Sequence, residues 1–503
     1  MNQLKAGAVL NYVIIGLNSL VGLLYTPYML HKLGQSEFGL YSLVASVISY
    51  LAVLDLGFGS AIVRYTAKYR AEGKLREQYE LFGFFLLFFL FVGFVVMIAG
   101  GWLCFNVDTL FSETMTPSEI SRAQIMMLIL VLNLAFTFPM SIFGSILTAY
   151  ERFIFPKVIN IISIALNTFV MVILLHYGYR AIAMVVVQTI FNFFTLITQY
   201  FYCRNILHIK IIFGKLKFGF LCEISLFSFW IFLDVIMNKI YWSTGQFVLA
   251  AVSGTMAVAV FAVAIQLHSM YMMFSSAISS VFLPKITAIV ATGNNYQEIS
   301  DLFIKTGRVQ NIIMLGVLLG FVIFGKSFII LWAGAEYEKS YLIALLFFVA
   351  LYVPLIQNLG IAILQARNQM KFRSVMYIII SVVALFLQIV FAKIWGAIGC
   401  AIAISGALFI GQGVVMNIYY KKVQKLDIVT FWKEIFRMNA FPVVLSILFF
   451  FIVKEQQIDS WGSLLIWMSI YMISMLTILY RYSINQSEKE LVFVFLNKLG
   501  WKK

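Results

Sequence analysis

The chain has 503 residues, of which 62% are hydrophobic and 11% charged, and its formal net charge is +15. Its mean hydropathy of +0.96 goes with more apolar surface than a water-facing exterior carries, since soluble chains are about 45–50% apolar and about a quarter charged. The composition therefore excludes a soluble enzyme and a secreted disulfide scaffold. The apolar runs lack strand-type alternation, which excludes an outer-membrane barrel.

Fourteen apolar runs are long enough to cross a bilayer, because a spanning helix needs about 20 apolar residues. In chain order they lie near 8–30, 39–63, 81–103, 123–150, 158–178, 181–202, 223–246, 256–283, 309–332, 341–364, 374–394, 396–419, 439–453 and 462–480. They leave no room for a soluble domain. We predict an all-α polytopic membrane protein with about 14 transmembrane helices, whose function lies within the membrane.

The basic residues between the spans predict the orientation, because cytoplasmic loops carry an excess of Lys and Arg. With the N-terminus inside, most of the 36 basic residues fall in cytoplasmic segments. We therefore expect both termini in the cytoplasm, and we interpret the positive charge as a topogenic signal rather than a surface for nucleic acid. The first apolar run is too long for a cleaved signal peptide, so we expect the first span to be retained.

An internal repeat has an offset of about 220 residues. Gly34, Phe38 and Tyr41 fall on Gly254, Val258 and Phe261, and Pro139 has a counterpart in Pro354. Six spans per repeat keep both copies in the same orientation, which predicts two parallel six-helix lobes with a cavity between them. We place the N-lobe at 1–222 and the C-lobe at 223–438. Helices 13 and 14 follow at 439–480, and 481–503 forms either an interfacial cytoplasmic tail or a solvated one.

Motifs for catalysis and metal binding are missing. The run from Gly320 to Ser327 fits G-x-x-x-x-G-K-[ST], but its four intervening residues are bulky and apolar, unlike a loop that cradles phosphates. The four histidines have no metal-ligand partners at i+4. We therefore expect no enzymatic activity, no metal site and no cofactor apart from a coupling proton or Na⁺.

Polar side chains inside spans are informative because each costs free energy in lipid unless it faces protein or water. Those on shared faces belong to the first, second, seventh and eighth predicted helices: Asn11, Asn18, Tyr25, Ser46, Ser49, Trp230, Asn238, Tyr241, Trp242 and Gln266. Either they join packed helices or they line a hydrated central pathway. We favour the pathway and predict that these residues line the cavity.

Three ionisable residues lie well inside spans: Asp55, Asp234 and Lys239. An unpaired charge at such a position costs at least ~2.5–3.5 kcal/mol, so a partner or a cavity is expected. Gly57-Phe58-Gly59 follows Asp55 and can unwind the helix there, as ion sites in transporters often require. We hypothesise that Asp55 or Asp234 binds a proton or Na⁺. The alternative is a structural ion pair with Lys239 or Arg64, and Lys239 can also snorkel to the membrane surface.

The run from Leu33 to Leu43, the segment Leu54-Asp55-Leu56-Gly57-Phe58-Gly59, and the later Arg64-Tyr65 and Lys68 together resemble a known signature. It is the N-terminal signature of bacterial polysaccharide flippases of the O-antigen and capsule type. These belong to the multidrug/oligosaccharidyl-lipid/polysaccharide exporter superfamily. The fourteen spans and tandem halves extend the resemblance over nearly the whole chain.

The resemblance implies a multi-pass protein of the bacterial inner membrane that flips a polyprenyl-pyrophosphate-linked oligosaccharide from the cytoplasmic to the external leaflet. It implies alternating access coupled to an ion gradient or to the membrane potential. Arg64 and Lys68 match basic positions of the family and, with Lys239, are expected to attract the diphosphate. Membrane lipid, a polysaccharide polymerase and glycosyltransferases are the expected partners, and nucleic acid is not.

Two other functions stay open. A cation-coupled multidrug exporter shares the architecture but usually has twelve spans and lacks this opening signature. A polytopic glycan polymerase or ligase is disfavoured by the short predicted external loops and the missing catalytic residues.

Overall fold

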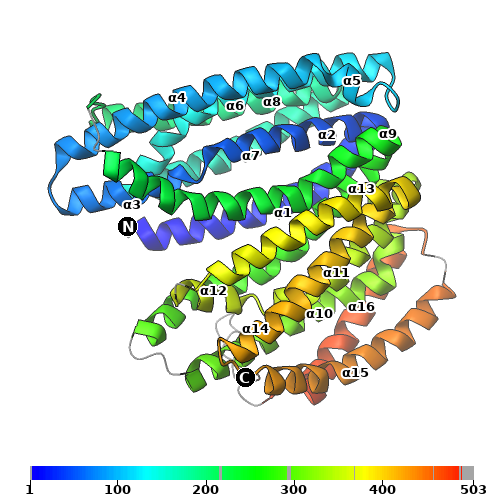
Figure 1. Ribbon diagram of the computed structural model, residues 1–503. Coiled ribbons are helices and arrows are strands. Elements are labelled where there is room, and N and C mark those ends of the chain that lie inside the picture. Colours follow the sequence, from blue (N-terminus) through cyan, green and yellow to red (C-terminus); the bar gives the residue numbers. More distant parts are fainter. Residues whose placement is uncertain are drawn as a thin grey trace. The chain divides into compact units, whose positions relative to one another are not determined.

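The computed structural model describes residues 3–214, 218–291, 296–367, 369–456, 458–485 and 489, and all the regular elements in these ranges are helices (Figure 1). The first nine α-helices are α1 (Gln3–Leu33), α2 (Gln35–Leu51), α3 (Phe58–Ala71), α4 (Leu75–Phe105), α5 (Val107–Phe111), α6 (Pro117–Ala149), α7 (Ile154–His176), α8 (Ala181–Asn205) and α9 (Phe218–Ala291). The others are α10 (Tyr296–Ala333), α11 (Lys339–Ile356), α12 (Leu359–Ala366), α13 (Lys371–Leu408), α14 (Met416–Lys422), α15 (Ile428–Lys454) and α16 (Trp461–Ile478). Short 3₁₀ turns, η1 (Ala52–Asp55) and η2 (Ala335–Tyr337), and π-helical turns, η3 (Phe409–Val415) and η4 (Leu479–Ser483), complete the set.

Twelve helical stretches in the described ranges are long and apolar enough to cross a membrane. Two of them, Val235–Ser276 and Lys371–Lys422, are far longer than one crossing requires. Each contains an internal break and covers two predicted spans, so the twelve stretches account for all fourteen. The prediction of an all-α polytopic membrane protein is confirmed.

The two breaks occur at glycines with positive φ, and each has a positive-φ glycine about 220 residues earlier in the chain. Gly254 breaks α9 with φ 79° and ψ −178°, and its repeat partner Gly34, between α1 and α2, has φ 78° and ψ 167°. Gly396 breaks α13 with φ 57°, and Gly178, between α7 and α8, has φ 85°. Side chains rarely tolerate a positive φ, so glycine at these positions lets the chain reverse in a single residue.

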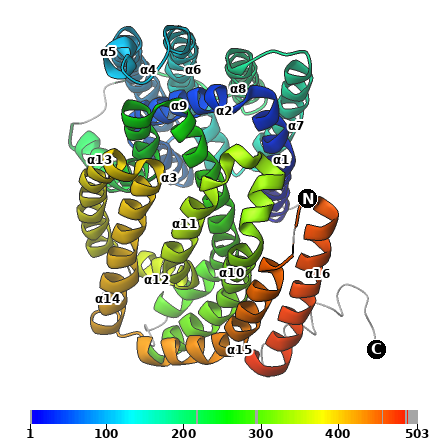
Figure 2. The ribbon, with the colours of Figure 1, turned by 90° about the vertical axis from the view of Figure 1, so that its right-hand side faces the viewer.

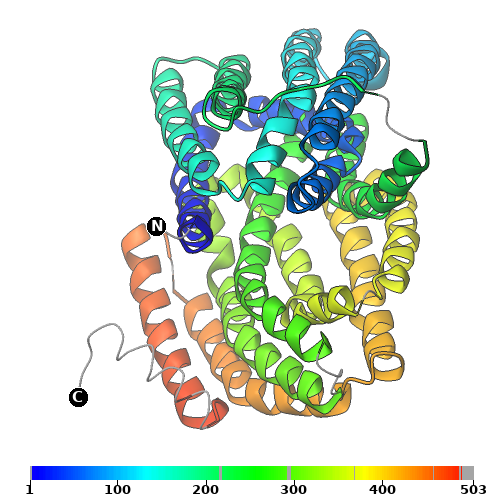
Figure 3. The ribbon, with the colours of Figure 1, turned by 90° about the vertical axis from the view of Figure 1, so that its left-hand side faces the viewer.

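The chain divides into two compact units, residues 1–262 with 392–397 (unit 1) and residues 263–391 with 398–503 (unit 2). In unit 1, α4 packs along α6, and α1 packs along α7 (Figures 1 and 3). In unit 2, α10 contacts α11, α15 and α16 (Figure 2). The lobe boundaries expected at residues 222 and 438 stay a prediction.

The core of unit 1 is rich in phenylalanine. Phe85 and Phe89 on α4 are fully buried, and Phe89 stacks on Phe138 of α6 with 6.3 Å between ring centroids. Next to them Gly93 of α4 lies so close to α6 that an added Cβ would sit 2.7 Å from the carbonyl oxygen of Ala135. Small residues at such contacts let membrane helices approach closely, and dispersion then holds them together.

The core of unit 2 contains a band of buried polar side chains. The guanidinium of Arg308 on α10 donates to the Glu434 carboxylate on α15 at 2.6 Å and to the Ser483 carbonyl at 3.2 Å. One turn along, Asn311 donates to Asn439 at 2.7 Å, and Asn439 donates to the Tyr352 hydroxyl at 2.8 Å. These bonds fasten α15 and the end of α16 to the rest of unit 2.

Two further sequence predictions concern a possible phosphate-binding loop and the C-terminal tail. The run Gly320–Ser327 lies inside α10, so its backbone is helical and forms no phosphate-cradling loop. The interfacial helix expected in the tail 481–503 lies mostly outside the described residues.

Gly39 provides a test of the close packing between α2 and α9. A Cβ at Gly39 would lie 1.9 Å from the carbonyl oxygen of Thr255, a backbone atom that cannot rotate away. We expect Gly39→Ala to destabilise the protein by about 1–3 kcal/mol, as overpacking of a filled core does. Thermal unfolding of detergent-purified protein measures the effect. Gly16→Ala is the matched control, because nothing lies within 4 Å of the added methyl, and an equal loss in both variants would contradict the packing argument.

Candidate functional site

Several predicted cavity residues meet where α2 contacts the first half of α9 within unit 1. The Ser49 hydroxyl donates to the backbone carbonyl of Ser46 at 2.7 Å and lies 3.2 Å from the Ser243 hydroxyl of α9, to which it also donates. Ser46 is buried and donates to the Leu43 carbonyl at 2.7 Å. Ser46 and Ser49 therefore bond to backbone carbonyls within α2, and Ser49 also links α2 to α9.

Tyr50 extends the contact by one residue. Its hydroxyl bonds the hydroxyl of Thr244 and lies 3.5 Å from the backbone carbonyl oxygen of Lys239. Lys239 itself is half-buried, as is Asn238 beside it. The rings of Tyr241 and Trp242 follow, with centroids 5.5 Å apart, Tyr241 being fully buried. An aromatic and polar surface thus runs along this part of α9.

The segment around Asp55 is unwound, as the sequence predicts. The 3₁₀ turn η1 ends at Asp55, Leu56 and Gly57 are left-handed with φ 52° and 72°, and α3 starts at Phe58. The half-buried Asp55 carboxylate accepts a hydrogen bond from the backbone N–H of Gly57. An acidic side chain at a break between two membrane helices has the form of an ion site.

Arg64 and Lys68 lie one turn apart on α3, and both are exposed. The Arg64 guanidinium lies 5.7 Å from the centroid of the Tyr65 ring. Exposed cations on one helix suit an anionic ligand that reaches them from solvent or from the membrane surface.

Two of the polar residues predicted to share a face of α1 contact α7. Lys157 donates to the Asn11 side-chain oxygen at 2.7 Å, and the Tyr25 hydroxyl lies 3.3 Å from the sulfur of Met171. Asn18 is exposed. Gln266 is half-buried and belongs to unit 2. The side chains of Trp230 and Asp234 lie outside the described residues.

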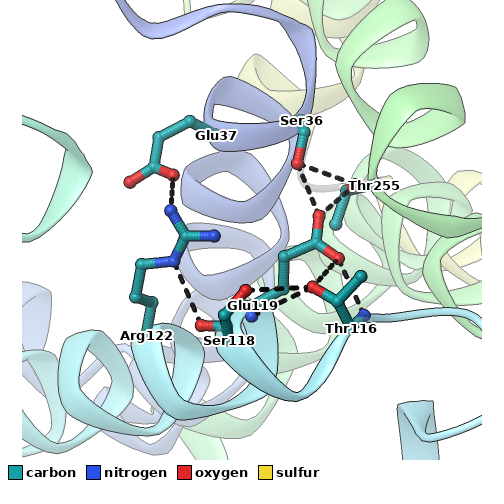
Figure 4. Close-up of polar contacts among 7 residues, drawn as sticks. All are labelled: Ser36, Glu37, Thr116, Ser118, Glu119, Arg122 and Thr255. Atoms are coloured by element: carbon teal, nitrogen blue, oxygen red, sulfur yellow. Dashed lines mark hydrogen bonds and ion pairs between the residues drawn. The ribbon is translucent and has the colours of Figure 1, made fainter.

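A buried carboxylate joins three segments at the end of unit 1 where α2 and α6 begin (Figure 4). Glu119 accepts hydrogen bonds from the Ser36 hydroxyl at 2.5 Å, the Thr255 hydroxyl at 2.9 Å, and both the backbone N–H and hydroxyl of Thr116 at 2.9 Å. Thr255 directly follows the Gly254 break. We call Ser36, Thr116, Glu119 and Thr255 the Glu119 cluster.

An ion pair and two further contacts surround the Glu119 cluster. Arg122 of α6 donates to Glu37 of α2 at 2.5 Å, and Glu37 is only 5% exposed. The Thr114 hydroxyl donates to the Ala250 carbonyl at 2.6 Å, and the ring of Phe111 contacts that of Phe247 at 5.5 Å. The break in α9 is therefore held to the starts of both α2 and α6.

Glu119 is not among the site residues predicted from the sequence. Thr116 and Glu119 form a capping box at the start of α6, a pattern that can be read from the T-x-x-E spacing. The contacts with Ser36 and Thr255 carry no such signal, because 83 and 136 residues separate the partners.

Unit 2 contains an apolar groove of about 450 Å³ between α10 and α16. Gly316 and Gly320 hollow out one wall, and Phe321, Met472 and Leu476 are among the side chains that line it. Nearly all of its surface is hydrocarbon or sulfur, so it suits an apolar chain and offers little to a polar group.

The fold is similar to those of solved transporters. A structure described as "Lipid II flippase MurJ, inward closed conformation" aligns with a TM-score of 0.72 and 17% identity, covering 94% of this chain and 98% of the other. An inward-facing multidrug resistance MATE family transporter of the MOP superfamily aligns with a TM-score of 0.61 and 14% identity, covering 82% of this chain and 99% of the other.

A MOP superfamily transporter from Pyrococcus furiosus Vc1, described as having a binding pocket of reverse polarity, aligns with a TM-score of 0.55 and 13% identity and covers 84% of this chain and 98% of its own. At these identities the likeness concerns the fold alone. No curated relative matches the chain in sequence.

The family model "Polysaccharide biosynthesis protein" matches residues 4–290, which is more than half of the chain and includes the segment from Leu33 to Lys68 that carries the flippase-like signature. The chain therefore belongs to the polysaccharide biosynthesis protein family.

Proposed function

We propose that the protein flips a polyprenyl-pyrophosphate-linked oligosaccharide from the cytoplasmic to the external leaflet of the bacterial inner membrane, by alternating access. The family match over residues 4–290 of a multi-pass membrane protein carries this proposal. The MurJ and MATE folds support it, because both names describe proteins that move substrates across membranes. A polysaccharide polymerase and glycosyltransferases would supply and consume the substrate.

The three parts of such a substrate need three kinds of surface. The diphosphate needs cations, and the exposed Arg64 and Lys68 on α3 with Lys239 on α9 are the candidates. The polyprenyl chain needs an apolar surface that opens to lipid, and the groove between α10 and α16 fits that requirement. The half-buried ring of Trp242, packed against the buried Tyr241, offers a stacking surface for part of the oligosaccharide.

Two energy sources suit the transport step. With the inside negative, moving a charge of −2 outward across 100 mV gains about 4.6 kcal/mol, from ~2.3 kcal/mol per charge. Cations that move with the head group would cancel this gain, and an exchanged ion would then be needed. Asp55, at the break after η1, and Asp234 are our candidates for binding that proton or Na⁺.

The Glu119 cluster acts as a latch at the end of unit 1 that we expect to face outside. Its hydrogen bonds hold the break in α9 against α2 and α6. We propose that opening of this end moves the break in α9 away from α2 and α6, so that the cluster releases during each cycle. Hydrogen bonds to a charged group are each worth about 1.5–3 kcal/mol, enough to bias a two-state equilibrium yet reversible.

Deletion of the gene tests the function. We expect the lipid-linked oligosaccharide to accumulate in the inner leaflet of the cytoplasmic membrane, detected by its inaccessibility to an externally added glycosidase. Purified protein in proteoliposomes should restore access. Unchanged glycan export with lost drug resistance would instead identify a multidrug exporter, and formation of glycosidic bonds by the purified protein would identify a polymerase or ligase.

The coupling proposal predicts that Asp55→Asn and Asp234→Asn, alone or together, remove the response of transport to a proton or Na⁺ gradient. An amide keeps the shape of the carboxylate but carries no charge to bind the ion. Proteoliposome flux measured with and without each gradient gives the result. Asp108→Asn, at an exposed position in α5, is the matched control. A double variant that still responds fully would refute ion coupling at these residues.

The latch predicts that Glu119→Leu shifts the protein toward the form open to the outside. A cysteine introduced at Ala259, fully buried on α9 next to Gly39, reports the change in a background without native cysteines. We expect an externally added, membrane-impermeant maleimide to label it at least about tenfold faster in Glu119→Leu, because the lost hydrogen bonds exceed 1.4 kcal/mol. Glu113→Leu, at an exposed position between α5 and α6, is the control. Equal labelling in both variants would contradict the latch.

A further inference from the structure

A second concave site lies wholly inside unit 1, between α2, α6, α7 and α8, with a volume of about 430 Å³. Five amide side chains line it: Asn133, Asn160, Asn167, Gln188 and Asn192. Asn133, Asn167 and Asn192 lie more than two turns from either end of α6, α7 and α8, and Asn160 lies less than two turns from the start of α7. Such a concentration of amides costs free energy in a bilayer unless protein, water or a ligand satisfies them.

One wall of this amide pocket is already ordered by hydrogen bonds. The Asn192 amide donates to the Asn133 oxygen at 2.6 Å and to the Thr137 hydroxyl at 2.8 Å. On the next turn of α8, the Thr195 hydroxyl lies 3.4 Å from that of Ser163 on α7. At the rim, Tyr41 of α2 donates to the Gln188 oxygen at 3.1 Å.

The α7 side of the pocket also has an unmet acceptor. The side-chain oxygen of Asn167 on α7 is buried and has no hydrogen-bond partner among the described residues. A buried acceptor without a partner costs about 1–3 kcal/mol. Rotation of the Asn167 side chain would turn this oxygen toward the pocket, where a donor of a ligand would recover that cost, so the pocket favours an occupant with hydroxyl or N–H groups.

The chemistry of the lining selects the class of occupant. Amides and hydroxyls both donate and accept, as sugar hydroxyls do, and the ring of Phe191 with Ile164 and Leu134 offers apolar surface for the C–H faces of a pyranose. No acidic, basic or histidine side chain lines the pocket within the described residues. A diphosphate would find no cation here, and a metal cation would find only neutral oxygens.

We propose that the amide pocket of unit 1 binds a sugar residue of the transported glycan. This inference rests on the proposed function and deepens it, because it assigns the carbohydrate part of the substrate to residues other than those assigned to the diphosphate. The pocket volume of about 430 Å³ suits a sugar residue, since small-molecule sites commonly measure about 300–1,000 Å³. Asn167 and Asn192, on facing helices, are the residues on which sugar recognition depends.

Binding of two lipids to the full-length protein in nanodiscs tests the proposal. One probe is polyprenyl diphosphate, and the other is the same lipid carrying the oligosaccharide. We expect the unmodified protein to bind the glycosylated lipid at least about tenfold more tightly. Asn167→Leu and Asn192→Leu, which keep the side-chain size, should erase that preference and leave the affinity for polyprenyl diphosphate unchanged.

Thr189→Val on α8 is the control, because its hydroxyl donates to the Val185 carbonyl of its own helix and does not line the pocket. It should retain the preference for the glycosylated lipid. Equal affinity of the unmodified protein for the two lipids, or a preference that survives in both asparagine variants, would overturn the sugar site. So would variants that lose Na⁺ dependence of transport yet keep the preference, since that result identifies a cation site.

Failure of the proposed function has a different signature. It would appear as absence of flipping by the unmodified protein in proteoliposomes, whatever its preference between the two lipids. A protein that flips the glycosylated lipid without preferring it would leave the flippase function standing and remove only the sugar site.

Discussion

The structure depends on one constraint, the cost of placing polar groups in hydrocarbon. Each such group costs free energy unless it finds a partner. In unit 2 the Arg308–Glu434 pair and the Asn311–Asn439 bond fasten α15 to α10. In unit 1 Glu119 collects donors from three segments. Apolar contacts hold the helices together without selecting one particular arrangement. The few hydrogen bonds between specific partners fix which helices lie side by side and at which height.

The helical, membrane-spanning fold follows from the sequence because the signal is long and redundant. A run of 20 apolar residues has one stable form in a bilayer, and small errors at its ends do not change the answer. The break after Asp55 is also predictable, since Gly57 lies next to a charge inside a span. Gly34 and Gly254 could be paired from the repeat, and their nearly identical backbone conformations give that pairing a physical basis.

The contacts between distant segments could not be predicted. Asn133, Asn167 and Asn192 lie in three different predicted spans, and nothing in the spacing of one sequence reports that they share a pocket. Nor does the sequence report that Glu119 and Thr255, 136 residues apart, are hydrogen-bonded. Single-helix faces identified the α1, α2 and α9 residues, whereas the amide pocket needs three helices to be placed first.

The single-residue reversals at Gly254 and Gly396 have a consequence for how the protein is made. Two successive spans joined by one glycine leave almost no chain outside the helices, so we expect the pair to insert together as a helical hairpin. The topology of the second span is then fixed by the first, and charges placed near one will reorient both. The same geometry leaves no extended peptide between the two helices for a protease to cut or an antibody to bind.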